Sequence, residues 1–354
     1  MKNVLITGGA GFIGSNLAKR LGNTQYNLYV FDNLHPQVHP GGQRPALLPT
    51  YAELLQKDVT SAEDWQMVLK QVRPDIIVHL AAETGTGQSL TEASRHGSVN
   101  VVGTTRMIDA LTRAGIVPEH IIIASSRAVY GEGAWRSAQG ETFYPDPRPH
   151  AMLAAGQWDF TDAHGQLAMP IPSRADITRP NPSNVYAATK LAQEHILNAW
   201  TSAMGVPLSV LRLQNVYGPG QSLQNSYTGV VAFFARTASQ GGVINVYEDG
   251  NIIRDFVFVE DVVTALEKTI AKPPDRKRVL DVGLGQKISI LDLARRTARI
   301  FGAPSPQVSG KYRDGDVRAA SCDMSETTKA LDFAPQWDAE KGLRTLVDWV
   351  RSIA

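Results

Sequence analysis

Near its first residue the chain carries Val4-Leu5-Ile6-Thr7-Gly8-Gly9-Ala10-Gly11-Phe12-Ile13-Gly14, an apolar run that breaks into glycines and then resumes with helical spacing. This pattern predicts a strand, a tight turn and a helix. Glycines in such a turn allow the backbone to approach a pyrophosphate, and the helix points its free N–H groups at the anion. Gly8, Gly11 and Gly14 therefore indicate a dinucleotide-binding turn.

A carboxylate follows at the expected distance. A second apolar run, Leu28-Tyr29-Val30-Phe31, ends in Asp32, about 20 residues beyond the glycines. A carboxylate at this place accepts hydrogen bonds from the ribose hydroxyls of NAD, and it repels the 2′-phosphate of NADP. The expected cofactor is therefore NAD.

Length, charge and cysteine content narrow the class of protein. A chain of 354 residues exceeds an average domain, which favours one large α/β unit with a second lobe. A net charge of +1 creates no general attraction for nucleic acids or membrane surfaces. One cysteine, Cys322, excludes an internal disulfide and a zinc site built from cysteines. With no apolar run of membrane-spanning length and no room for a signal peptide before the first strand, we expect a cytoplasmic protein.

Further apolar runs predict a parallel sheet. Residues 76–82 and 121–124 are almost wholly apolar, as strands covered on both faces are, and another strand is expected to end at Asp58-Val59. The expected fold is α/β, a doubly wound Rossmann sheet with a smaller carboxyl-terminal α/β lobe for the substrate. The expected domains are residues 1–215 for NAD, with an insertion at about 131–182, and residues 216–354 for the substrate, with the chain returning to the first domain around 255–283.

The insertion shows no hydrophobic periodicity and is rich in Pro, Gly, Ala and Trp. A loop of this length is usually functional, and its aromatic residues indicate that it packs against the rest of the protein. The insertion also contains potential metal ligands, but their spacing matches no established site, so no metal is expected. These residues are His150, Asp159, Asp162 and His164.

Three residues indicate oxidation chemistry. Tyr186 and Lys190 lie four positions apart in a predicted helix, hence on one face, and Ser126 follows the strand at 121–124. A free tyrosine, with a pKa of about 10, is a poor base, and a lysine ammonium together with a positive nicotinamide ring lowers that pKa. Tyr186 would remove a proton from a sugar hydroxyl while hydride leaves for NAD. Ser126 would hold the same oxygen, and Lys190 would bind the nicotinamide ribose.

Taken together, these motifs resemble the extended short-chain dehydrogenases/reductases of the NAD-dependent nucleotide-sugar epimerase/dehydratase family. The resemblance covers nearly the whole chain apart from the insertion. It rests on residues 7–14, 32–34, 58–59, 79–82, 100–104, 125–126, 129–131, 186–190, 211–219, 254–259 and 313–316.

The resemblance implies a set of binding residues and a homodimer paired through the helices that begin near Gly97 and Val185. The implied cofactor-binding residues are Gly8, Gly11, Phe12, Ile13, Gly14, Asp32, Asn33, Asp58, Val59, Leu80, Ala81, Ala82, Thr84, Asn100, Tyr186 and Lys190. The implied substrate-binding residues are Thr84, Ser126, Asn215, Arg254 and Arg313, the last three on the phosphates of a nucleotide diphosphate sugar. Gln214 stands where related epimerases often have an aromatic residue, which leaves its cofactor contact open.

Departures from the family pattern narrow the reaction. Arg127 and Ala128 stand where sugar-nucleotide 4,6-dehydratases have an Asp-Glu pair, and decarboxylating relatives have Glu in place of Ala128. The remaining reaction is 4-epimerisation: oxidation to a 4-keto sugar, rotation of that intermediate, and return of the hydride to its other face.

A narrower resemblance indicates the substrate. Residues 33–39, 82–89 and 125–133 are similar to a set that includes dTDP-L-rhamnose 4-epimerases. The expected reaction is thus dTDP-L-rhamnose to dTDP-6-deoxy-L-talose. The alternatives are a UDP-glucose/UDP-galactose 4-epimerase, a sugar-nucleotide reductase or dehydrogenase that releases its cofactor, and a non-catalytic NAD-binding protein.

Overall fold

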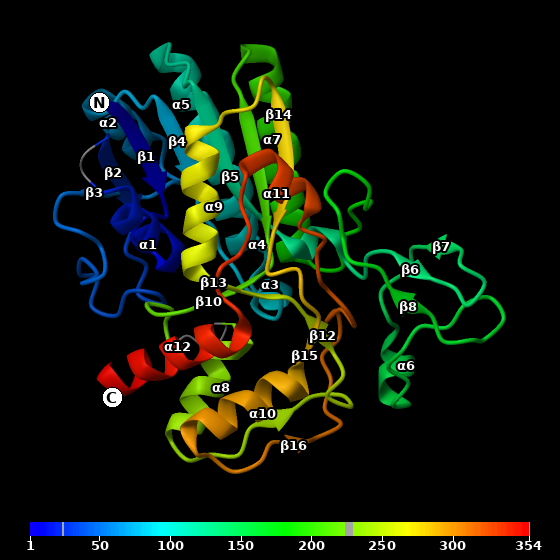
Figure 1. Ribbon diagram of the computed structural model, residues 1–354. Helices are drawn as coiled ribbons and strands as arrows, with labels where there is room; N and C mark the ends of the chain where they lie inside the picture. The colour runs from blue at the N-terminus through cyan, green and yellow to red at the C-terminus, as the bar shows by residue number, and fades with distance from the viewer. Residues whose placement is uncertain (23–24, 224–228, 354) are drawn as a thin grey trace.

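A seven-stranded parallel sheet forms the centre of the protein (Figure 1). The structure is a computed structural model that describes residues 1–22, 25–223 and 229–353. The strand order is β14-β9-β5-β4-β1-β2-β3. The chain adds β2 and β3 on one side of β1 and then continues with β4 on the other side, so the order in which strands are added reverses between β1 and β4. The strands are β1 (Lys2–Thr7), β2 (Tyr26–Asp32), β3 (Glu53–Gln56), β4 (Ile76–His79), β5 (His120–Ser126), β9 (Leu208–Leu213) and β14 (Lys277–Val282).

Helices cover both faces of this sheet. Successive strand residues point to opposite faces, so Leu5 and Ile121 pack toward α2, α5 and α7, whereas Ile6 and Ile122 pack toward α1 and α9. The helices are α1 (Phe12–Leu21), α2 (Ala62–Gln71), α5 (Gly103–Ala114), α7 (Val185–Met204) and α9 (Val259–Ala271). The predicted doubly wound α/β fold is confirmed. Among the described residues, no helix has both the length and the apolar character needed to cross a bilayer.

The carboxyl-terminal part of the chain forms a helical layer beyond the carboxyl ends of the strands (Figure 1). Its helices pack on one another and share the core with the α1 face of the sheet. They are α8 (Val230–Ser239), α10 (Ile290–Phe301) and α12 (Ala339–Ile353), with α11 (Ser325–Leu331) beside β14. The same part of the chain contains three short strand pairs: β10 (Asn215–Tyr217) with β13 (Phe256–Phe258), β11 (Asn245–Val246) with β16 (Gln307–Val308), and β12 (Ile253–Arg254) with β15 (Ile288–Ser289).

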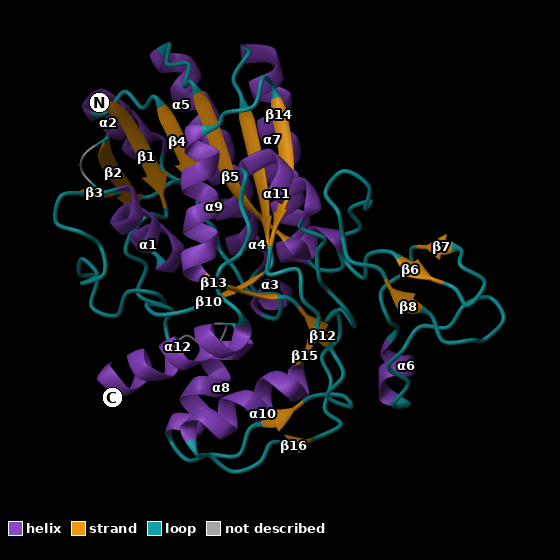
Figure 2. Cartoon of the chain, in the orientation of Figure 1, coloured by secondary structure: helices purple, strands orange, loops and turns teal. Residues whose placement is uncertain are grey.

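The insertion, residues 131–182, projects to one side of the main sheet (Figure 2). It contains a three-stranded antiparallel sheet, in which Trp135 packs edge-on against Phe160 with ring centroids 4.9 Å apart. Its elements are β6 (Trp135–Arg136), β7 (Thr142–Phe143), α6 (His150–Ala154) and β8 (Met169–Pro170). Strands of two residues are too short to show alternation, which is why the sequence shows no periodicity there.

One predicted boundary is wrong, and one predicted helix starts where expected but in another form. β3 ends at Gln56, so Asp58 lies in the following turn, where its backbone N–H donates to Asp64 Oδ2 at 2.8 Å. The helix expected from Gly97 begins with a π-helical segment, Gly97–Val102, before α5. The remaining short helices are α3 (Gln88–Thr91), α4 (Ala93–His96) and the 3-10 turn Arg127–Tyr130.

Candidate active site

The glycine turn lies where the strand order reverses, and its backbone leaves no room for side chains. Gly8 has φ +64°, and a Cβ there would lie 2.7 Å from Ala81 Cα. A Cβ on Gly14 would lie 2.4 Å from Gly9 Cα. Gly11 caps α1 without a side-chain hydrogen bond, and helix geometry leaves the N–H groups of the first turn, at Phe12 and Ile13, without intrahelical acceptors. This cradle fits a pyrophosphate.

The carboxylate of Asp32 orders the turn from the neighbouring strand. Asp32 Oδ2 accepts the Ala10 N–H at 3.0 Å, and Oδ1 accepts the Leu34 N–H at 2.9 Å. An ionised carboxylate has about four acceptor sites, so capacity remains for ribose hydroxyls. The turn and Asp32 together fit NAD.

The predicted adenine-side residues gather around Asp58. Burial alone would raise the pKa of Asp58, but hydrogen bonds from Asn33 and Thr60 outweigh it and lower that pKa. Asn33 Nδ2 donates to Asp58 Oδ2 at 3.0 Å, and Val59 is buried next to it. Asn33, Asp58 and Val59 therefore form one edge of the predicted cofactor site.

Ser126 and Tyr186 face each other across the carboxyl end of β5. Ser126 Oγ accepts the Ala128 N–H at 3.1 Å, which starts the 3-10 turn, and the Ser126 hydroxyl is near enough to Tyr186 to act on its pKa. Tyr186 stands in the first turn of α7, whose amino end is capped by Asn184. Burial raises the pKa of Tyr186, while the Ser126 hydrogen bond and the Arg127 charge act against that rise. The chain alone therefore keeps Tyr186 protonated at neutral pH.

Lys190 lies one helical turn beyond Tyr186 and is buried. Burial lowers the pKa of Lys190 to about 8, and the Glu194 carboxylate acts in the opposite direction. Among the described residues the protein charge that lowers the pKa of Tyr186 is that of Arg127, not that of Lys190. Arg127 is thus a charge beside Tyr186 for which the sequence analysis gave no role.

Asn100 holds the loop after β4 against the catalytic helix. Its Nδ2 donates to the Glu83 carbonyl at 3.0 Å and to Thr189 Oγ1 at 2.9 Å, and its Oδ1 accepts the Glu83 N–H at 2.8 Å. Asn100 is fully buried, so it supports a cofactor site through this loop. The same loop contains the predicted residues Leu80, Ala81, Ala82 and Thr84, of which Thr84 is exposed.

The predicted phosphate ligands lie in β10, in β12 and in the loop after β16, and they differ in exposure and in bonding. Arg254 is 4% exposed, and its Nη2 lies 2.6 Å from Asp316 Oδ1. Arg313 is exposed, with its guanidinium 5.0 Å from the centre of the Tyr247 ring. Asn215, at the start of β10, has a buried Oδ1 without a partner among the described residues. Asn215 and Arg313 are thus available to a ligand, whereas part of the Arg254 guanidinium is already bonded.

Sequence reasoning missed a buried chain of hydrogen bonds that links the glycine turn to α7. Thr7 Oγ1 lies 2.7 Å from His79 Nδ1, and His79 Nε2 lies 3.0 Å from Thr104 Oγ1. Gln193 Nε2 on α7 completes the chain by donating to Thr104 Oγ1 at 2.8 Å. Burial lowers the pKa of His79 to about 3, so the ring is neutral. These hydrogen bonds fix the position of α7 relative to the strands β1 and β4 beside the glycine turn.

The potential metal ligands of the insertion are held apart by other partners. His150 Nδ1 lies 3.0 Å from Asp314 Oδ1, Asp159 pairs with Arg318, and Asp162 Oδ1 accepts the His164 N–H. Each carboxylate is thus committed to a local contact.

Comparisons with known proteins agree with this geometry. A family model described as "NAD dependent epimerase/dehydratase family" matches residues 4–155 and 161–283. The chain is 56% identical over 349 residues to a dTDP-L-rhamnose 4-epimerase of Burkholderia thailandensis, covering 99% of the chain and 95% of that protein. It is 28% identical to a UDP-glucose 4-epimerase of Mycolicibacterium smegmatis, covering 98% of each.

Solved structures show the same architecture. A UDP-glucose 4-epimerase of Thermotoga maritima, solved with UDP-glucose, superposes with a TM-score of 0.78 at 27% identity and covers 99% of each chain. A UDP-glucose 4-epimerase of Thermus thermophilus, solved with NAD, gives a TM-score of 0.77 at 26% identity, covering 99% of this chain and all of that one.

Proposed function

The chain belongs to the NAD-dependent epimerase/dehydratase family, and from this we propose that it is a nucleotide-sugar 4-epimerase with NAD as its cofactor. The observation that carries the proposal is that Ser126 and Arg127, at the carboxyl edge of the sheet, both act to lower the pKa of Tyr186, beside a turn that fits a pyrophosphate. Elimination of water would need an acid and a base beside the sugar, and the positions after Ser126 hold Arg127 and Ala128.

The proton transfer at the C4 oxygen involves Tyr186 and Ser126. The glycine turn and Asp32 would hold NAD, which when bound would supply the acceptor for the hydride of C4 of the sugar and the donor for its return. Tyr186 takes the proton of the C4 hydroxyl and later returns it to the 4-keto oxygen, and Ser126 holds that oxygen by a hydrogen bond. Burial raises the pKa of Tyr186, so Ser126 and the Arg127 charge are needed to bring the phenolate within reach. Lys190 binds the ribose of the cofactor.

The proposed substrate is dTDP-L-rhamnose, converted to dTDP-6-deoxy-L-talose. The support is the 56% identity to the Burkholderia thailandensis enzyme, over nearly the full length of both chains. A UDP-glucose 4-epimerase is the second candidate, which the Mycolicibacterium smegmatis relative and the Thermotoga maritima structure favour. Both candidates need Asn215, Arg254 and Arg313 at the diphosphate.

The test is to incubate the pure protein separately with dTDP-L-rhamnose and UDP-galactose, without added NAD, and to assign C4 of the products by NMR. We expect the first sugar to be inverted at C4 by cofactor that purifies with the protein. Conversion of UDP-galactose alone would assign the second candidate. Consumption of added NAD in proportion to sugar would identify a dehydrogenase. No turnover with NAD supplied would contradict the proposal.

Assembly and location are further parts of the proposal. α5 and α7 pack together on one side of the sheet, and a homodimer through these two helices rests on the family resemblance. A cytoplasmic location is supported by the single cysteine, Cys322, which is buried and unpaired, as is typical of proteins in a reducing compartment.

A further inference from the structure

Two loops leave the sheet on either side of β1, and both begin beside the glycine turn. In the sheet β1 lies between β2 and β4, and one loop follows the carboxyl end of each of these neighbours. At the end of β2, Asp32 Oδ2 accepts the Ala10 N–H at 3.0 Å. After β4, Ala81 lies so close to the turn that a Cβ on Gly8 would be 2.7 Å from Ala81 Cα. The two loops therefore start on opposite sides of the predicted pyrophosphate site.

Farther along the chain, side-chain hydrogen bonds join these two loops to each other. Gln37, in the loop after β2, and Gln88 of α3 exchange hydrogen bonds between their amides, with Nε2–Oε1 distances of 3.1 and 3.2 Å. Arg95 Nη2 of α4 donates to Gln37 Oε1 at 2.8 Å. Because α3 and α4 follow β4, these bonds connect the ends of β2 and β4 across the end of β1. We call Gln37, Gln88 and Arg95 the arch.

The closed arch is favoured over an open one. Gln88 is 2% exposed, so its separation from Gln37 leaves a buried amide short of hydrogen bonds. Arg95 carries a charge, and a hydrogen bond from a charged donor is stronger than one between neutral groups. The Arg95 side chain is 28% exposed, so water replaces part of this bond when the arch opens. Opening therefore costs free energy but stays possible.

The arch is also tied to the helix that carries the catalytic residues. Arg95 Nη2 donates to Glu83 Oε1 at 2.8 Å. Asn100 holds the backbone of Glu83 with two hydrogen bonds, of 2.8 and 3.0 Å, and donates to Thr189 Oγ1 of α7 at 2.9 Å. The side of the arch that follows β4 is thus fixed to α7, so opening moves the loop that carries Gln37.

We propose that Arg95, Gln37 and Gln88 are positioning residues that retain the cofactor, and that NAD and NADH leave only after Gln37 separates from Gln88 and Arg95. In folds of this type the pyrophosphate binds at the first turn and the ribose at the carboxylate after the second strand, and the arch crosses the same edge of the sheet. The inference rests on the proposed function, because an epimerase must keep the reduced cofactor until the hydride returns to the sugar.

The test measures how fast NAD leaves Gln37→Ala, Arg95→Met and the double variant. Each protein is loaded with isotopically labelled NAD, excess unlabelled NAD is added, and the label that stays with the protein is followed by filtration. We expect release to be about 3- to 10-fold faster for Gln37→Ala and about 10- to 50-fold faster for Arg95→Met. The effects should not multiply in the double variant, because the two side chains share a bond. With NAD in excess, kcat for dTDP-L-rhamnose should stay near the wild-type value.

A first control removes a comparable surface arginine. Arg296 Nε lies 2.8 Å from Asp292 Oδ2 on α10, and its side chain is 37% exposed. Arg296→Met should leave both the release rate and the Tm unchanged.

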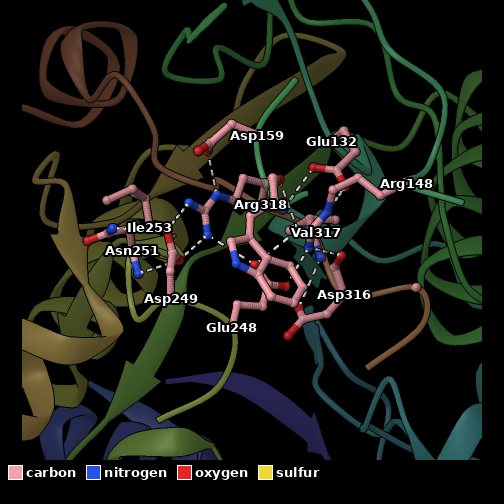
Figure 3. Close-up of polar contacts among 12 residues, drawn as sticks. Glu132, Arg148, Asp159, Glu248, Asp249, Asn251, Ile253, Asp316, Val317 and Arg318 are labelled. Atoms are coloured by element: carbon pink, nitrogen blue, oxygen red, sulfur yellow. Dashed lines mark hydrogen bonds and ion pairs between the residues drawn. The ribbon is translucent and has the colours of Figure 1, made fainter. Parts of the chain in front are cut away.

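A second control lowers stability at a place outside the arch. Buried ion pairs fasten the insertion to the carboxyl-terminal lobe (Figure 3). Arg148 Nη2 lies 2.9 Å from Glu248 Oε1, and Arg318 Nη1 lies 3.0 Å from Glu248 Oε2. The side chains of Arg148 and Glu248 are each 1% exposed, so Arg148→Met leaves an uncompensated buried charge. This variant should have a lower Tm and an unchanged rate of NAD release.

Two results would overturn the proposal. The first is a release rate that stays at the wild-type value in both Gln37→Ala and Arg95→Met. The second is release from Arg148→Met that is as fast as from Arg95→Met, which would mean that overall stability governs retention. Neither measurement needs a sugar, so failure of the proposed function, seen as no turnover by the wild-type protein, remains a separate outcome.

Discussion

Glu194 and Arg212 form a buried ion pair, with Oε2 2.7 Å from Nη2 and Oε1 3.0 Å from Nε, that fastens the helix carrying Tyr186 to β9. Ser125 donates to the same carboxylate, and the Arg212 guanidinium lies 4.8 Å from the centre of the Tyr130 ring. An ion pair shielded from solvent therefore holds α7 to β9.

Loss of this pair should be costly. Glu194→Ala leaves Arg212 buried without its partner, and we expect the free energy of unfolding to fall by about 3–5 kcal/mol in urea denaturation. Glu340→Ala is the matched control, because Glu340 pairs with Arg299 and Arg344 at the surface and such pairs contribute about 0–1 kcal/mol. Equal losses in the two variants would contradict the role given to the Glu194 pair.

Replacing the catalytic tyrosine should separate chemistry from binding. Tyr186→Phe removes the proton acceptor, so kcat should fall by about 10²–10⁴-fold while bound NAD, measured by absorbance after denaturation, stays at the wild-type ratio. Tyr217→Phe is the control: its hydroxyl is buried and has no partner among the described residues, so turnover should be unchanged. Normal turnover by Tyr186→Phe would refute the mechanism.

The pH dependence of kcat should depend on the two groups, Ser126 and Arg127, that lower the pKa of Tyr186. Ser126→Ala removes the hydrogen bond that lowers that pKa, and Arg127→Met removes the charge that lowers it. Either change raises the pKa, so a higher pH is needed to form the phenolate, and the acid limb of kcat should move to higher pH. Arg127→Lys should leave the limb near its wild-type position. A limb that stays in place in both former variants would show that another group titrates there.

A buried carboxyl group at the end of β14 should make stability depend on pH. Burial raises the pKa of Asp281 from 3.8 to about 7, although Tyr130 donates to its Oδ1 at 2.8 Å. The folded state therefore holds this proton while the unfolded chain loses it, so the Asp281 contribution to the free energy of unfolding falls between pH 4 and 7. The difference is at most about 4 kcal/mol.

Asp281→Asn isolates the contribution of Asp281 ionisation to the free energy of unfolding. The amide keeps an acceptor for Tyr130 and cannot ionise, so the variant should gain on the wild type as the pH rises from 4 to 7 in urea denaturation. Asp249→Asn is the control without such a pH dependence: the Arg318 hydrogen bonds outweigh burial and lower the pKa of Asp249, so this carboxyl is ionised in both the folded and the unfolded chain between pH 4 and 7. A constant difference between Asp281→Asn and the wild type across this range would rule out the assigned titration.

Two glycines with positive φ allow the effect of a steric clash at the glycine turn to be separated from the effect of backbone strain. Gly8 and Gly115 have φ +64° and +61°, but only Gly8 would bring a Cβ to 2.7 Å from a backbone atom, Ala81 Cα. Gly115→Ala should cost about 1–2 kcal/mol and keep NAD. Gly8→Ala should cost more and lose NAD on gel filtration. Equal retention of NAD would show that the close contact with Ala81 is not required.

The parts predicted from sequence are those whose signals are local. Each of these signals lies within one or two neighbouring elements. They are the glycine turn, Asp32, and the four-residue spacing of Tyr186 and Lys190. The fold could therefore be inferred, and the catalytic residues predicted, before any contact was known. The π-helical segment at Gly97–Val102 could not, because its residues have ordinary helical spacing.

The parts that sequence reasoning missed depend on partners far apart in the chain. Glu132 meets Arg318 across 186 residues, and Thr7 meets His79 across 72. Arg148 and Glu132 stand in a stretch without hydrophobic periodicity, and only folding shows that they are buried. The absence of a partner for the buried Gln214 amide among the described residues is likewise invisible until its surroundings are assembled.

The ion pairs of Figure 3 also define what can be exchanged between proteins. The insertion contributes Glu132, Arg148 and Asp159. Apart from the pair that Arg148 forms with Glu132 inside the insertion, their partners in this network come from residues 248–249 and 316–318. A chimera that received the insertion alone would place its charges against unmatched residues. A recipient scaffold must therefore receive the insertion and these two short segments together if the buried ion pairs are to be kept.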